Sequence, residues 1–129
     1  MKRCFVVALA IGVLLYPAQR AEAKMGVWLS LAPSPPQLGE RAEIRLRPFW
    51  TFLDGNRPAL VTYPFSVEAV SPRGNISHIS VIRSADPYVW IGHFVFRRAG
   101  RWEVRVANWG PRYEPYPGHR PRVWVTIRP

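Results

Sequence analysis

Hydrophobic and polar positions alternate along most of the chain after residue 24. In five runs, apolar side chains occupy every second position and polar or charged side chains lie between them. This period of two is typical of a half-buried β-strand, with one face on the core and one in water. A sixth run is less regular, and a seventh is apolar on both sides, which predicts a more deeply buried strand. The regular runs are 27–31, 42–47, 65–69, 101–106 and 123–127, and the others are 76–82 and 88–96.

Turn-forming residues separate these runs. Gly, Pro, Asn and Asp gather in the intervals, for example at 54–56 and 72–75. The 14 prolines are spread so widely that no long helix fits between them after residue 24. About seven short strands joined by such turns predict an all-β domain, an immunoglobulin-like β-sandwich over residues 24–129. We expect Trp102, Phe94 and Phe96 to fill its centre.

The first residues follow a different pattern. Lys2 and Arg3 precede an apolar run over 5–16, and Ala21 and Ala23 place small residues where a signal peptidase reads them. This layout predicts a cleavable signal peptide over 1–23, with a signal helix, ahead of an exported domain. The apolar run is shorter than the roughly 20 residues that cross a bilayer. The alternative is that the segment stays in place and anchors the domain at a membrane.

Two stretches resemble bacterial extracytoplasmic immunoglobulin-like modules. The first is Pro35-Pro36-Gln37-Leu38-Gly39-Glu40, which precedes the strand predicted over 42–47. The second is 90–96 followed by 99–106, where an Ala-Gly turn leads into a strand containing Trp102. The layout is similar to that of YtkA-like and FixH-like domains. The resemblance implies the immunoglobulin-like fold over most of 27–128. The related metal-handling families carry Met- and His-rich segments, whereas this chain has Met25 and three widely separated histidines.

The residue types that carry catalysis form no motif here. The carboxylates lie beside turns or at polar strand positions, without the paired arrangement of acid-base catalysis. The serines lack a nucleophile elbow. The single cysteine, Cys4, lies within the predicted signal, so residues 24–129 contain neither disulfides nor thiolate metal sites. We therefore expect a non-catalytic protein without a cofactor.

Histidine offers one route to a metal site. His78 and His93 lie on neighbouring predicted strands, and Met25 could add a soft ligand for copper. Their spacing matches no metal-binding motif, so we expect no resident metal. A sandwich that handles a metal or a small ligand outside the cytoplasm is the alternative function.

The chain is strongly basic, with 18 Lys and Arg against 8 Asp and Glu and a net charge of +10. Arg45 and Arg47 project from the polar side of one predicted strand, and Arg101 and Arg105 from that of another. On an exported protein, such charge predicts a protein or an anionic cell-surface component as partner, including a membrane surface at its periphery. Export argues against nucleic acid. The other interpretation is a solvated face that keeps the protein soluble.

The segment 109–120 combines aromatic rings, prolines and cations in a long loop. Prolines restrict the loop, and aromatic residues with Arg dominate the energetics of many interfaces. We predict a binding loop here, although the same tyrosines could instead pack on the end of the sandwich. Trp50 and Phe52 mark a second aromatic patch. The predicted binding residues of the loop are Trp109, Arg112, Tyr113, Tyr116, His119 and Arg120.

Overall fold

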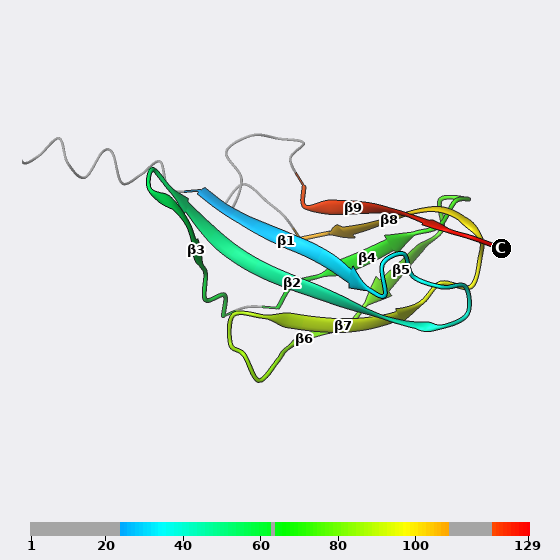
Figure 1. Ribbon diagram of the computed structural model, residues 1–129, viewed down its shortest axis with the longest axis horizontal. Coiled ribbons are helices and arrows are strands. Elements are labelled where there is room, and N and C mark those ends of the chain that lie inside the picture. Colours follow the sequence, from blue (N-terminus) through cyan, green and yellow to red (C-terminus); the bar gives the residue numbers. More distant parts are fainter. Residues whose placement is uncertain (1–23, 63, 109–119) are drawn as a thin grey trace, which may run out of the picture.

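The computed structural model describes residues 24–62, 64–108 and 120–129 (Figure 1). The predicted signal peptide over 1–23, with its helix, lies outside these residues. All regular structure in the described part is β-strand, as the alternating pattern predicted. Within that part, no helix is long and apolar enough to cross a membrane.

Nine strands are present in the described residues. Each of the five regular runs coincides with a strand, which confirms the reading of their period. The strands are β1 (Lys24–Ala32), β2 (Arg41–Phe52), β3 (Gly55–Pro58), β4 (Val67–Val70), β5 (Ile76–Ile79), β6 (Val81–Arg83), β7 (Trp90–Val95), β8 (Gly100–Val106) and β9 (Arg122–Ile127).

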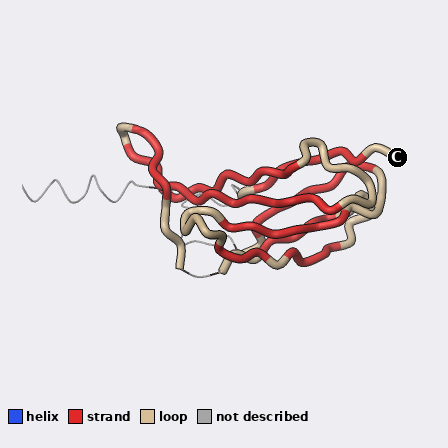
Figure 2. The backbone as a smooth tube through the Cα atoms, turned by 60° about the horizontal axis from the view of Figure 1, so that its bottom comes forward, coloured by secondary structure: helices blue, strands red, loops and turns tan. Residues whose placement is uncertain are grey.

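The strands form two antiparallel sheets that pack face to face as a β-sandwich (Figure 2). The first sheet has the order β1-β2-β7-β6, and β3 pairs with the part of β2 that extends beyond β7. The second sheet has the order β5-β4-β8-β9. The β2–β3 hairpin projects at the end of the sandwich where β1 begins, opposite the C-terminus (Figure 1).

The core lies between the sheets and is closed by aromatic rings. Phe96 is completely buried, and its ring centroid lies 5.2 Å from that of Trp102. Phe94 meets both, at 4.9 Å from Phe96 and 5.8 Å from Trp102. The predicted central cluster is thus confirmed. Edge-to-face rings of this kind add to the stabilisation that burial provides.

Two differences raise the strand number above the predicted seven. The chain reverses at Leu53 and Asp54, so that Gly55 and Asn56, predicted as turn residues, begin β3. The run 76–82 divides at Ser80 into β5 and β6, which belong to different sheets. A Cβ on Gly92 would lie 2.8 Å from the Ser80 carbonyl oxygen, so this crossing requires glycine on β7.

Candidate binding site

The outer face of the first sheet carries a stacked aromatic pair. Trp28 on β1 and Phe49 on β2 have ring centroids 4.6 Å apart and planes tilted by 31°. The ring of Phe49 lies across Gly26, its partner in the register of β1 and β2. Because Gly26 has no side chain, the Phe49 ring lies flat against the sheet and packs against the ring of Trp28. Trp28 remains 55% exposed, so the stack presents an aromatic surface to solvent.

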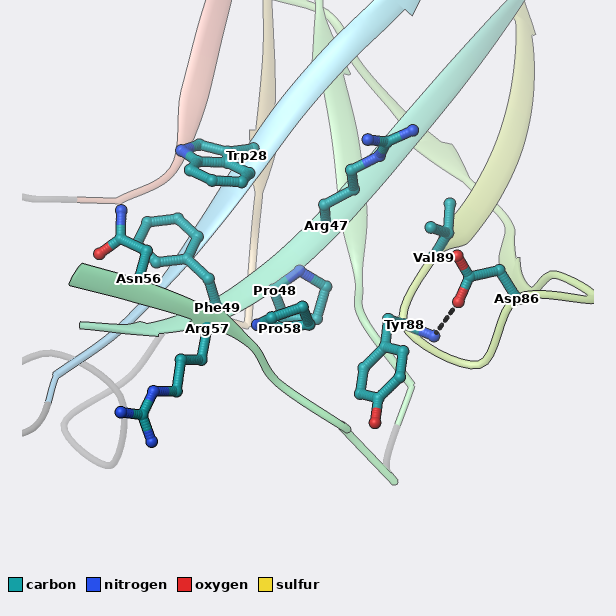
Figure 3. A pocket seen from close by; sticks show the side chains of 10 residues that line it. All are labelled: Trp28, Arg47, Pro48, Phe49, Asn56, Arg57, Pro58, Asp86, Tyr88 and Val89. Atoms are coloured by element: carbon teal, nitrogen blue, oxygen red, sulfur yellow. Dashed lines mark hydrogen bonds between the residues drawn. The ribbon is translucent and has the colours of Figure 1, made fainter. Parts of the chain in front are cut away.

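This stack forms one side of a pocket of about 250 Å³ (Figure 3). Tyr88 and Asp86, from the loop between β6 and β7, form the other side, and Pro48 and Pro58 lie between the two sides. The pocket exists because β7 pairs with β2 only up to Leu46, while β3 begins its pairing at Phe49. The remaining lining residues are Arg47, Asn56, Arg57 and Val89.

The loop that carries Tyr88 is held by hydrogen bonds. The backbone N–H of Tyr88 donates to Asp86 Oδ1 at 3.0 Å, and that of Val89 donates to the Asp86 carbonyl at 3.0 Å. The Ser84 N–H donates to the Val89 carbonyl at 2.8 Å, which closes the loop at its base. Asp86 therefore fixes the backbone beside the pocket, and the ring of Tyr88 faces it from a defined position.

Arg47 is one of two arginines that line this pocket, with Arg57. It is exposed, and no described residue forms an ion pair or hydrogen bond with its side chain. Its neighbours differ in this respect: Arg45 Nε donates to Glu43 Oε2 at 2.8 Å, and Arg57 Nη2 donates to Asp54 Oδ2 at 2.7 Å. A guanidinium without a partner among the described residues is suited to a bidentate contact with a carboxylate or phosphate.

On the outer face of the second sheet, charged side chains form ion pairs with one another. Arg105 bonds to Glu68 at 3.0 Å and to Glu103 at 3.2 Å, and Arg122 approaches Glu103 at 3.9 Å. The hydrogen bond to Glu68 is the main reason that the pKa of Arg105 is raised above its ordinary value. Glu103 is buried by these contacts. Arg105 and Arg122 therefore have ion-pair partners within the sheet, and these pairs stabilise it.

Trp124 also lies on the outer face of the second sheet, and two arginines lie near its ring. Arg101 lies 4.3 Å and Arg122 5.8 Å from the ring centroid of Trp124. The aromatic side chain thus has its cation-π partners within the chain. The contrast with Trp28, which faces an open pocket, makes the first sheet the better candidate for binding.

Of the predicted binding loop, only Arg120 lies in the described part of the chain, where it is exposed. Trp109, Arg112, Tyr113, Tyr116 and His119 lie outside the described residues. The residues beside the loop are well held. The Asn108 side chain accepts a hydrogen bond from the Ser66 N–H at 2.9 Å and donates one to the Pro64 carbonyl at 3.0 Å.

His78 and His93 do not lie together in the structure. His78 pairs with Glu68 on β4 and His93 pairs with Glu43 on β2, so they lie on the outer faces of opposite sheets. The expectation that they lie on neighbouring strands is wrong, because the chain changes sheets at Ser80 between them. Met25 is buried in the core. Among the described residues, no three His, Cys, Asp or Glu side chains gather as a metal would need.

Sequence reasoning found only part of the pocket. Trp28 and Arg47 occupy outward positions of the two predicted strands, and Arg47 was expected to project from one of them, whereas Phe49 lies beyond the predicted end of its strand at residue 47. The opposition of Gly26 and Phe49 depends on the strand register, which the pattern leaves open. Tyr88 was placed in a strand by its apolar surroundings, but it lies in the preceding loop and is exposed.

Comparison with known proteins identifies no relatives for these features. No protein-family model matches the chain, and no curated protein matches it. The site is therefore judged on its geometry and chemistry.

Proposed function

We propose that this chain is an exported, non-catalytic immunoglobulin-like module that binds an acidic segment of a partner protein at the pocket on the first sheet. The strand orders support the fold part of this proposal. Read as strands A, B, E and D, the order β1-β2-β7-β6 corresponds to one immunoglobulin sheet, and β5-β4-β8-β9 corresponds to C′, C, F and G.

Export is proposed from the sequence of residues 1–23. The predicted cleavage site follows Ala23, and β1 starts at Lys24, which pairs with Thr51. Cleavage there leaves every strand intact. We expect the mature protein, recovered outside the cytoplasm and sequenced from its N-terminus, to begin at Lys24. Recovery of the protein with residues 1–23 attached to a membrane would favour the anchored form.

The observation that carries the binding proposal is Arg47, which lines the pocket together with Trp28 and Tyr88 and has no ion-pair partner among the described residues. Trp, Tyr and Arg are the side chains most enriched at the energetic centres of interfaces. The pocket of about 250 Å³ is smaller than most pockets that enclose whole ligands. A chain segment that places one carboxylate on Arg47 and an apolar ring on Trp28 fits these dimensions better.

A labelled peptide of alternating Glu and Pro residues tests this function. Aromatic grooves bind extended proline-containing chains, and glutamate supplies the carboxylate for Arg47. We expect the full chain to bind this peptide and Arg47→Gln to weaken the affinity about tenfold, a typical loss at an interface hot spot.

Arg73→Gln is the matched control. Arg73 is exposed in the turn between β4 and β5, and its substitution removes the same charge from the molecule. We expect this variant to change the affinity less than about twofold, as for a peripheral charge. Equal losses in both variants would mean that net charge alone attracts the peptide, and the proposal would then be rejected.

A further inference from the structure

The β2–β3 hairpin ends in apolar side chains that are exposed to solvent. Leu53 stands at the turn and is 101% exposed, and Trp50 and Phe52 are each more than one-third exposed. Hairpin turns usually carry Gly, Asn, Asp or Ser, because these residues favour turn geometry and face water. A fully exposed leucine at such a tip therefore calls for an apolar partner.

The hairpin places its aromatic residues on one side. Trp50 is the cross-strand partner of Arg57 in the hairpin and of Met25 on β1, and Phe52 is two residues further along the same face. Arg57 lies 4.8 Å from the ring centroid of Phe52 and also bonds to Asp54. The tip thus combines apolar side chains with one ion pair, Arg57–Asp54.

The side chains of this tip suit the interfacial layer of a lipid bilayer. Trp and Phe prefer the level of the lipid headgroups, leucine prefers the acyl region below, and cations remain near the headgroup phosphates. The net charge of +10 favours approach to an anionic surface.

The point at which residues 1–23 join the domain also favours a membrane as the partner of the tip. Lys24 is paired opposite Thr51 in the hairpin, so the preceding apolar run over 5–16 is joined to the fold at this end. Residues 17–24 span at most roughly 25 Å when extended. While the signal segment is held in a membrane, the hairpin end is therefore kept close to that membrane.

We propose that the tip formed by Trp50, Phe52 and Leu53 inserts into the interfacial layer of an anionic membrane. Leu53 enters the acyl region, the two rings lie at headgroup depth, and Arg57 remains at the phosphates. This contact depends on the apolar side chains at the hairpin tip, whereas the binding proposal depends on Arg47 and Trp28, although Arg57 belongs to both sites. Failure of one proposal therefore leaves the other standing.

The test places an environment-sensitive fluorophore at the tip of the full chain. In a Cys4→Ser background, Leu53→Cys is labelled with nitrobenzoxadiazole and mixed with vesicles of phosphatidylcholine and phosphatidylglycerol in equal amounts. We expect a blue shift of the emission and quenching by lipids brominated in the acyl chains. With phosphatidylcholine alone, the apparent affinity should fall, because the electrostatic attraction is lost.

Ile82→Cys, labelled in the same way, is the control. Ile82 is 70% exposed on β6, away from the hairpin, and the chain carries the same residues 1–23 in both proteins. The absence of a shift at position 53, or equal shifts at 53 and 82, would overturn the proposal. So would a shift at 53 that depends on protein concentration without vesicles, because it would assign the tip to a second copy of the chain.

A substitution without a label gives an independent measure. We expect Leu53→Ser to lower vesicle partitioning about tenfold, the loss that corresponds to one buried leucine side chain. Ile82→Ser should leave partitioning unchanged. Equal partitioning of the Leu53→Ser variant and the unmodified chain would contradict insertion of the tip.

Discussion

Phe49 lies across Gly26 on the neighbouring strand so closely that a Cβ added to Gly26 would be 2.4 Å from Phe49 Cζ. Real side chains do not approach to this distance, so glycine at position 26 is what permits the ring to lie flat. Phe49 cannot simply turn away, because its other side contacts Trp28. The backbone of β1 thus determines the shape of the pocket that the two rings form.

Gly26→Ala should therefore destabilise the protein. We expect a loss of about 1–3 kcal/mol in the free energy of unfolding, as for other overpacked sites, measured by urea titration. Ser30→Ala is the matched control, because Ser30 lies on the same strand and the same exposed face, opposite Arg45. Equal stability of the two variants would show that the ring moves without penalty.

Trp28→Ala should separate binding from folding. We expect the affinity for the Glu-Pro peptide to fall about tenfold, while the free energy of unfolding falls by about 1 kcal/mol through the lost ring contact. Trp124→Ala removes a tryptophan of similar exposure, 47% against 55%, from the opposite face. Isothermal titration calorimetry of both variants measures the affinities. A comparable loss with Trp124→Ala would contradict a site on the first sheet.

The Glu68–Arg105 pair should stabilise the second sheet measurably. Both side chains are largely buried, with 13% and 24% of their surfaces exposed. A double-mutant cycle with Glu68→Gln and Arg105→Gln should give a coupling energy of about 1–2 kcal/mol. The more exposed Glu43–Arg45 pair should give less than about 1 kcal/mol in the same experiment. A larger value for Glu43–Arg45 would show that burial does not decide the strength of these pairs.

The coupling energy between Glu68 and Arg105 should also remain constant as the pH becomes alkaline. The folded protein raises the pKa of Arg105, chiefly through its hydrogen bond to Glu68. A raised pKa means that the stabilisation is fully present below the unfolded pKa of arginine, which is itself strongly alkaline, and is lost only as the pH rises through the still higher folded pKa. Repeating the cycle from about pH 6 to about pH 10 should therefore give the same coupling energy. A decline within this range would contradict the assignment.

The loop predicted to bind remains a prediction that substitution can test. Replacing Trp109, Tyr113 and Tyr116 by alanine should leave the unfolding midpoint unchanged if the loop serves binding. The Asn108 side chain bonds to Pro64 and Ser66, and these two hydrogen bonds involve none of the replaced side chains. Capture of partner proteins by the variant and the unmodified chain provides the second readout. A marked fall in the unfolding midpoint would instead identify a packing loop.

Much of the fold could be read from the sequence because burial imposes a period of two. Ile44 and Leu46 face the core, while Arg45 between them faces water, as their alternation predicted. The aromatic cluster around Trp102 was also predictable, because large rings on inward positions need one another's surfaces. These inferences depend only on which residues avoid water.

The pocket could not be predicted in the same way, because it depends on where pairing stops. β7 leaves β2 at Leu46, β3 joins it at Phe49, and neither limit has a signal in the hydrophobic pattern. The Ser80 crossing was missed for a related reason. The short strands on either side of it look like one continuous run unless the close approach of Gly92 is known.

Three edge strands of this sandwich are bordered by proline. Pro33 directly follows β1, Pro58 ends β3, and Pro121 directly precedes β9. A proline has no N–H to offer an incoming strand, so pairing with another chain cannot extend past these points. At these three edges, proline therefore limits how far an incoming strand could extend its pairing, although exposed tryptophan and leucine side chains lie on the same domain.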